Sequence, residues 1–225
     1  MGSGESHAAV RTRRRLRVVG VLVLALCLVG ALAAGDVAAK KKKKHKTATV
    51  FTATSAPNAA VPDAPPTGPF VPLSSTLTVG KKFKGKTVGD VNVTGITTTG
   101  SDPGSASNLA MDLIAPNGRR VVLIGFDGGI GDQSIGPLTL DDDTPTSICD
   151  SATPDCSDPQ QSLLRPFAGT SNLYHLGGGD TGPLSSLNGV PMKGTWTFRV
   201  WDQDNTLTST LNAWGLQITA ARPVS

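Results

Sequence analysis

Hydrophobic and polar residues alternate along the C-terminal part of the chain. Two runs, residues 195–201 and 213–219, place an apolar side chain at every second position, which is the period of a β-strand. A short Asp-Gln-Asp-Asn turn separates them. The pattern therefore predicts two amphipathic strands whose buried faces include Trp196, Phe198 and Trp214.

Further short apolar runs lie upstream. Residues 109–114 and 120–126 flank a Pro-Asn-Gly turn and predict a β-hairpin. From about Leu73, shorter alternating runs are broken by glycines, and no helical period follows residue 35. With 26 glycines and 16 prolines, the chain is typical of an all-β fold. We expect a β-sandwich or jelly roll with short strands and long Gly/Asp-rich loops.

The N-terminal 39 residues have the pattern of an export segment. An arginine-rich stretch ends at Arg17, the apolar run 18–34 follows, and small residues come next. At 17 residues, the run fits a signal peptide and is at the short limit for a membrane span. Both interpretations place the rest of the chain outside the cytoplasm: it is secreted or extracellular, and membrane-anchored through residues 18–34 if the segment is not cleaved.

Residues 40–72 have the composition of a linker. A lysine-rich block occupies residues 40–46, and an Ala/Thr/Pro-rich stretch follows it. We expect this linker to be disordered and to precede one domain over residues 73–225. Two interpretations fit the lysines equally well: a solubilising spacer, and a segment that adheres to anionic lipid headgroups or wall polymers. We expect membrane contact only through the N-terminal segment and this lysine block.

The charge of the folded part differs from that of the whole chain. The chain carries a net charge of +4, but from Gly85 onward seven Lys/Arg face fourteen aspartates, a net of −7. Nucleic-acid binding needs clustered positive charge. Composition therefore argues against a nucleic-acid partner for the domain.

Eight segments in order resemble the P domain (P/Homo B domain) that follows the catalytic domain of subtilisin-like proprotein convertases. The resemblance covers roughly residues 88–220. The first four segments are a strand with a Pro-polar-Gly turn (109–118), a second strand (121–126), a Gly/Asp loop (127–133) and an acidic patch (140–143). The last four are an Arg-Pro pair (165–166), a leucine-containing loop (182–189), a Gly-Thr-Trp strand (194–200) and a closing Asn-x-Trp strand (211–218).

The resemblance implies a role that is not catalytic. The family module normally follows a protease domain, and residues 40–72 are too few to hold one. We expect a structural, binding or accessory module at the cell surface with an unidentified protein or surface ligand. An alternative is that it assists a subtilisin-like serine endopeptidase supplied in trans.

Carboxylates form the richest candidate site. Asp132, Asp141 and Asp142 are the candidate calcium ligands, with Asp127 and Asp143 as further members. Calcium takes six to eight oxygen ligands, and some members of the resembling family bind it in this module. The alternative is that these residues serve turns and face solvent.

Cys149 and Cys156 are the two cysteines of the expected exported part. An even, close pair in an oxidising compartment favours a disulfide. A metal site is the other interpretation of such a pair, but no histidine or third cysteine lies nearby.

Catalysis and sugar binding are less favoured. The histidines are His7, His45 and His175; only His175 falls in the expected domain, and no Gly-x-Ser-x-Gly motif accompanies it. We therefore expect no enzyme activity. A third possible function, a carbohydrate-binding jelly roll, needs exposed aromatic side chains, for which Tyr174 and Trp201 are the candidates.

Overall fold

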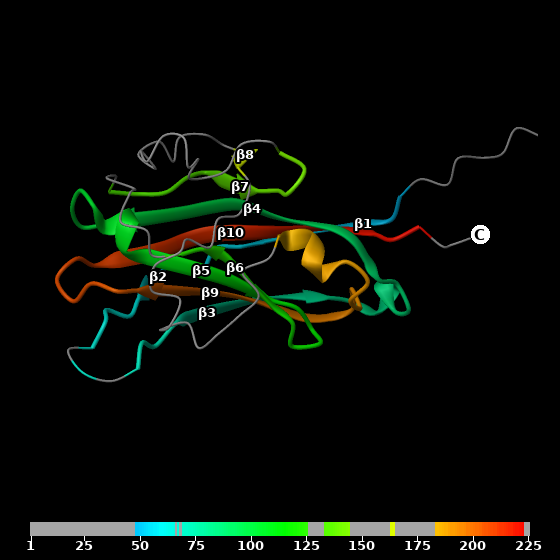
Figure 1. The fold of residues 1–225 in the computed structure, drawn as a ribbon, viewed down its shortest axis with the longest axis horizontal. Coiled ribbons are helices and arrows are strands. Elements are labelled where there is room, and N and C mark those ends of the chain that lie inside the picture. The colour runs from blue at the N-terminus through cyan, green and yellow to red at the C-terminus, as the bar shows by residue number, and fades with distance from the viewer. Residues whose placement is uncertain are drawn as a thin grey trace, which may run out of the picture. The chain divides into compact units, whose positions relative to one another are not determined.

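The computed structural model describes residues 48–65, 67, 69–125, 133–144, 163–164 and 183–222. These residues form two stacked sheets, and the fold is an all-β sandwich (Figure 1). The strands are β1 (Val50–Ser55), β2 (Ala59–Val61), β3 (Leu73–Val79), β4 (Val88–Gly100), β5 (Leu109–Ile114), β6 (Arg120–Ile124), β7 (Leu138–Leu140), β8 (Leu163–Leu164), β9 (Gly194–Asp202) and β10 (Ser209–Ala220). Three short 3-10 turns accompany them: η1 (Lys81–Phe83), η2 (Ser105–Asn108) and η4 (Leu184–Leu187).

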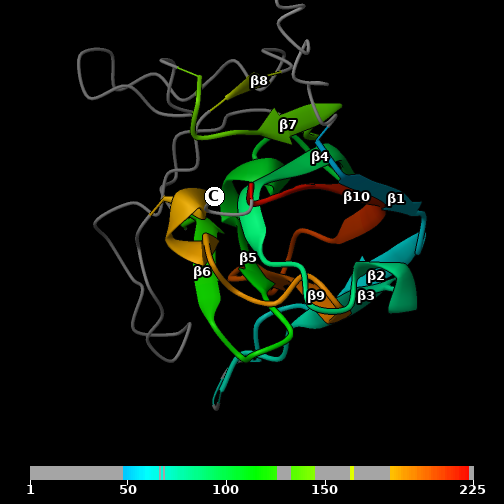
Figure 2. The same ribbon diagram turned by 90° about the vertical axis from the view of Figure 1, so that its right-hand side faces the viewer.

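The two sheets differ in size. The larger sheet has the order β1-β10-β4-β7-β8, and β2 also pairs with β10. The smaller sheet has the order β3-β9-β5-β6. All pairs in the described part of the chain are antiparallel except β7 with β8. Figure 2 looks along the sandwich and shows the two layers, with β7 and β8 far from β3.

Aromatic side chains fill the space between the sheets. Trp196 and Phe198 point inward from β9, and Trp214 points inward from β10; all three are fully buried. Phe198 and Trp214 stack with ring centroids 4.9 Å apart. The indole of Trp214 donates to Ser75 Oγ at 2.8 Å, so a hydrogen bond joins the two sheets inside the core. The predicted core positions of these three residues are confirmed.

The predicted hairpin is present as β5 and β6. Their turn is closed by a hydrogen bond from the Ala115 N–H to the Arg119 carbonyl at 2.8 Å. Gly118 has φ 85°, which glycine adopts without steric cost. The two C-terminal strands are present as β9 and β10.

The predicted boundary at residue 73 is wrong. One compact unit spans His45–Ser225, and β1 and β2 both pair with β10 inside residues 40–72, where a disordered linker was expected. Only Phe51 in β1 is a large apolar residue packed against the core. Alternating threonines and the neighbouring prolines hid this strand in the composition, whereas pairing with β10 satisfies its backbone.

Two strands of the predicted sandwich are longer than the others. β4 has 13 residues and β10 has 12. Two glycines expected to break strands lie inside β4. Gly95 has φ 60°, and the pairing registers with both neighbouring strands shift around it. At Gly89 a Cβ would lie 2.7 Å from Ala221 Cα. Glycine thus permits a bulge and a close backbone approach within one long strand.

Several predicted features lie outside the described residues. They are the segment 1–39 with its apolar run 18–34, the lysine block 40–46, the cysteines Cys149 and Cys156, the acids Asp127 and Asp132, and Arg165, Tyr174 and His175. Across the described ranges, no helix is long and apolar enough to cross a membrane.

Candidate functional site

Three carboxylates meet on the outer side of the larger sheet. β4 alternates so that Val91 and Val93 are buried in the core, while Asp90 and Asn92 are only partly buried. β7 pairs beside it, with Val93 opposite Leu140, and Asp141 to Asp143 come directly after β7. One carboxylate oxygen from each of Asp90, Asp141 and Asp143 lies within 4.8 Å of the other two.

The surroundings of Asp90 disfavour its ionised form. Burial, followed by the charges of Asp141 and Asp143, raises the pKa of Asp90. The Asp143 N–H donates to Asp141 Oδ1 at 2.8 Å and holds the two acids in one turn. Asn92, two positions along β4 from Asp90, has a side-chain oxygen that is inaccessible and accepts no hydrogen bond from the described residues. Its lone pairs have no donor there, which is costly for a buried oxygen.

These oxygens suit calcium. The ion binds oxygens at 2.3–2.6 Å, so two ligands on opposite sides of it lie about 5 Å apart, close to the spacing of the three carboxylates. Asp90, Asp141 and Asp143 could supply ligands, and the Asn92 amide oxygen lies on the same strand as Asp90. Water would complete the six to eight ligands that calcium takes.

The predicted ligands are distributed differently from the expectation. The structure brings Asp141 and Asp143 together with Asp90, which the sequence analysis did not select. Asp142 instead accepts the N–H groups of Leu184 and Ser185, at 3.0 and 2.5 Å, and so fixes η4. Asp132 and Asp127 lie outside the described residues. Asp90 could have been found only from the register of β4 against β7.

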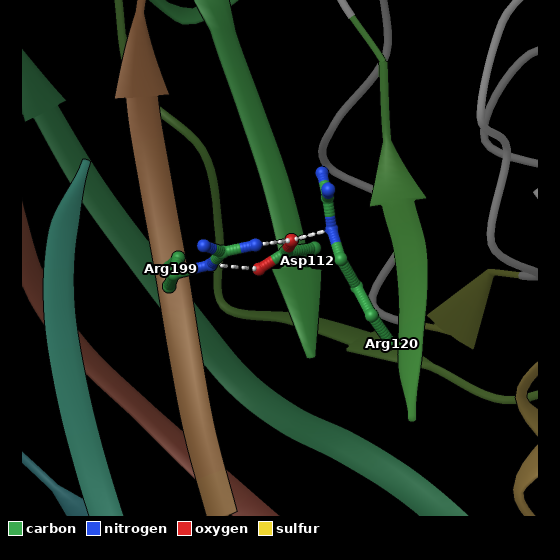
Figure 3. A network of polar contacts seen from close by, with 3 residues as sticks. All are labelled: Asp112, Arg120 and Arg199. Carbon is green, nitrogen blue, oxygen red and sulfur yellow. Dashed lines mark hydrogen bonds and ion pairs between the residues drawn. The ribbon is translucent and has the colours of Figure 1, made fainter. Parts of the chain in front are cut away.

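A second polar cluster lies on the outer side of the smaller sheet. Asp112 on β5 is fully buried, and Arg199 on β9 donates to both of its oxygens, at 3.0 and 2.6 Å (Figure 3). Arg120 on β6 forms an ion pair with the same carboxylate. Three neighbouring strands are therefore linked by one carboxylate between two guanidinium groups. The sequence analysis missed this cluster, because its members are far apart in the chain.

Trp201 covers this cluster. The guanidinium carbons of Arg199 and Arg120 lie 4.6 and 5.5 Å from its ring centroid, within cation–π distance. Trp201 is only 3% exposed, and Phe70 packs against the same group. The expected exposed sugar platform is therefore wrong for Trp201, because its ring is covered by protein; Tyr174 lies outside the described residues.

A third acidic group lies in the turn between β9 and β10. Asp202 is 1% exposed, and its Oδ1 accepts the Asp204 N–H at 2.9 Å. Burial raises the pKa of Asp202 to about 6, although the Asp204 N–H and the Ser209 hydroxyl oppose the shift. Asp204 accepts from the Thr206 hydroxyl and from backbone N–H groups, which lower the pKa of Asp204. These residues hold the turn closed and form no open site.

Comparisons with known proteins establish no family. No family model matches the sequence, and no curated protein matches it. The crystal structure of a serine protease of Aeromonas sobria is similar with 15% identity and a TM-score of 0.42, covering 78% of this chain and 28% of that chain. The structure of an Aeromonas sobria serine protease in complex with a chaperone is similar with 17% identity and a TM-score of 0.41. The match covers 79% of this chain and 28% of that chain. The chain thus spans under a third of either length, and similarity at this level does not establish shared function.

Proposed function

We propose that this chain is an exported, non-catalytic accessory module of the P-domain type, stabilised by calcium. The observation that carries the proposal is the position of the P-domain-like motifs in the fold. The strand and Pro-polar-Gly turn fall on β5 and its turn, the acidic patch on the end of β7, the leucine-containing loop on η4, and the two tryptophan segments on β9 and β10. Segments that resemble one module in order thus occupy one sandwich in order.

A structural or binding role agrees with how the described polar residues are used. Asp112 and Asp142 are both engaged in holding the fold, through two arginines and through η4. The described residues include no histidine or cysteine, so a nucleophile with a histidine base would have to involve other parts of the chain. The proposal therefore assigns binding and stabilisation to the sandwich, and no bond cleavage.

The proposed partner is a subtilisin-like serine endopeptidase encoded by the same genome without a module of this type. Binding to the folded protease alone would raise its melting temperature with the concentration of this chain. The test is to measure the melting temperature of such a protease with and without the purified full chain. A Trp214→Ala variant, whose core is disrupted, serves as the control. If no such protease responds to the intact chain, the partnership in trans is wrong.

Calcium is proposed at Asp90, Asp141 and Asp143. Thermal unfolding of the full chain in EDTA and then in a calcium titration tests this. An ion that binds only the folded state raises the melting temperature, and the rise grows with the logarithm of the ion concentration. Asp141→Asn should abolish the response, whereas Asp102→Asn, an exposed acid at the far end of β4, should retain it. If calcium does not raise the melting temperature of the original chain, the calcium site is refuted. The accessory role would still be tested separately by the protease experiment.

A further inference from the structure

Five lysines gather at the end of the sandwich where β3 leads into β4. Lys81, Lys82 and Lys84 are exposed, and Lys86 is half-buried. The exposed Lys193 is brought to the same place because the Met192 N–H donates to the Lys86 carbonyl at 3.0 Å and Thr87 pairs with Pro191. We call these five residues the basic corner.

The basic corner is held firmly by the core beneath it. Phe83, in the middle of the lysines, is 1% exposed and packs edge-to-face on Phe51, with ring centroids 5.6 Å apart. Three successive backbone hydrogen bonds, donated by Phe83, Lys84 and Lys86, close the turn at 3.0–3.1 Å. The lysines are thus presented from a buried anchor, and little backbone order would be lost when they meet a partner.

The charges of the basic corner are not neutralised within the described fold. The ion pairs found there all involve Asp112, none of them a lysine. The acidic cluster of Asp90, Asp141 and Asp143 is at the same end of the fold, since Asp90 is four residues after Lys86, but it lies where β4 pairs with β7, and β10 separates β4 from β1 in the larger sheet. Asp202 is the last residue of β9, at the end opposite Lys193, and Asp204 follows it.

The lysine block of the sequence joins the fold at this corner. Phe51, which contacts Phe83, is five residues after Lys46, and five extended residues span at most about 17 Å. The six lysines of the block thus precede, in the sequence, the strand that contacts Phe83, and the last of them is five residues before Phe51. The apolar run 18–34 ends 16 residues before Val50, so the basic corner is the end of the sandwich nearest, along the chain, to any bilayer that this run enters.

We infer that the basic corner is a docking surface for a bilayer of anionic phospholipids, and that it extends the lysine block onto the folded domain. Ammonium groups act as point charges toward phosphate and need no shaped pocket, which agrees with a convex turn as the binding element. Each lysine near an anionic surface contributes about a fivefold increase in binding. The partner is the headgroup layer rather than one lipid molecule.

The test uses two chains: the full chain, and a full-length variant in which the block lysines are replaced by glutamine. The second chain measures the contribution of the basic corner without that of the block. In each, Lys81→Gln, Lys84→Gln and Lys193→Gln are combined. The matched control is Thr99→Glu, Asn205→Glu and Thr208→Glu, which changes the net charge equally at exposed positions of the opposite end. Binding is measured to phosphatidylcholine vesicles, to vesicles that also contain phosphatidylglycerol, and to soluble polyphosphate, at low and high salt.

We expect the lysine triple to bind phosphatidylglycerol vesicles about a hundredfold more weakly in the block-neutralised chain, and to bind phosphatidylcholine vesicles unchanged. The control triple should retain anionic binding, because its new charges lie beyond the Debye length of about 8–10 Å. Equal losses in the two triples would show a net-charge effect and overturn the inference. The inference would also be overturned if the lysine triple lost binding to polyphosphate alone. It would equally be overturned if the lysine triple kept its melting temperature and bound phosphatidylglycerol vesicles as tightly as the original chain.

Discussion

At the scale of single residues, two neighbouring aspartates of the β9–β10 turn have opposite effects on stability. The pKa of Asp202 is raised to about 6 from 3.8, and the pKa of Asp204 is lowered. A carboxyl whose pKa is raised by folding favours the folded state when protonated. The free energy of unfolding should therefore fall as pH rises from about 4 to 6, by on the order of 3 kcal/mol from Asp202.

Asp202→Asn tests this directly. The amide can keep the oxygen that accepts the Asp204 N–H, and it carries no buried charge. We expect the variant to be more stable than the original chain at pH 7 and nearly equal to it at pH 4, as measured by urea unfolding across this range. A variant that is less stable at pH 7 would mean that the ionised carboxylate is satisfied in the fold.

Asp204→Asn is the comparison of opposite sign. Its ionised carboxylate accepts several hydrogen bonds in the turn, so it stabilises the fold above the unfolded pKa, and this contribution is lost as pH falls through the lowered folded pKa. The variant should be destabilised at pH 7, with a difference that shrinks in acid. Urea midpoints measured beside those of Asp202→Asn would show whether the two slopes differ in sign.

Asp112 is the residue whose replacement should cost most. Removing it leaves two guanidinium groups packed together under Trp201 without the carboxylate that they share. Breaking a buried ion pair at one partner typically costs about 3–5 kcal/mol, and we expect Asp112→Ala to lose that much in urea unfolding. Adding Arg199→Leu and Arg120→Met should recover a large part of it. If the triple variant is no more stable than Asp112→Ala, repulsion between the arginines is not the cause.

At the scale of elements, β1 decides where the domain begins. It pairs over six positions with β10 and contributes Phe51 to the contact with Phe83. Its loss would remove several hydrogen bonds, each contributing about 0.5–1.5 kcal/mol, and an apolar contact of about 1.5–3 kcal/mol. Together these approach the whole stability of an ordinary domain, about 5–15 kcal/mol.

A chain that starts at Lys46 should therefore fold, and one that starts at Leu73 should be largely unfolded by circular dichroism. Phe51→Ala in the longer chain should be folded but less stable by about 2–4 kcal/mol. A cooperative transition in the shorter chain, with a similar urea midpoint, would show that β1 and β2 add little to the sandwich.

The same elements show what the sequence could and could not predict. β5, β6, β9 and β10 were predictable because each alternates strongly around an apolar face. β1 was not, because threonine and alanine give little contrast between the faces of an edge strand. The acidic site was half predictable: Asp141 and Asp143 are two positions apart in the sequence, whereas Asp90 joins them only through the pairing of β4 with β7. The Asp112 cluster depends on three strands and has no local signal.

At the scale of the whole molecule, the calcium site and the Asp202 turn should act independently. Asp90 lies near the start of β4, while Asp202 lies near Ser209, which pairs with Gly100 at the strand's other end. Ten residues of strand separate these ends, about 33 Å. Changes this far apart without shared partners usually add within about 0.3–0.5 kcal/mol.

The double variant Asp141→Asn with Asp202→Asn should accordingly show the sum of the two single effects. Calcium should raise the melting temperature of Asp202→Asn by as much as it raises that of the original chain, and the pH dependence due to Asp202 should be the same in EDTA and in calcium. Thermal unfolding in EDTA and in calcium measures the first statement, and urea unfolding at pH 4 and pH 7 measures the second, each for the original chain, the two single variants and the double variant. A coupling energy above about 1 kcal/mol would mean that the long strands β4 and β10 transmit strain between the ends, because the fully buried core between them cannot relax locally.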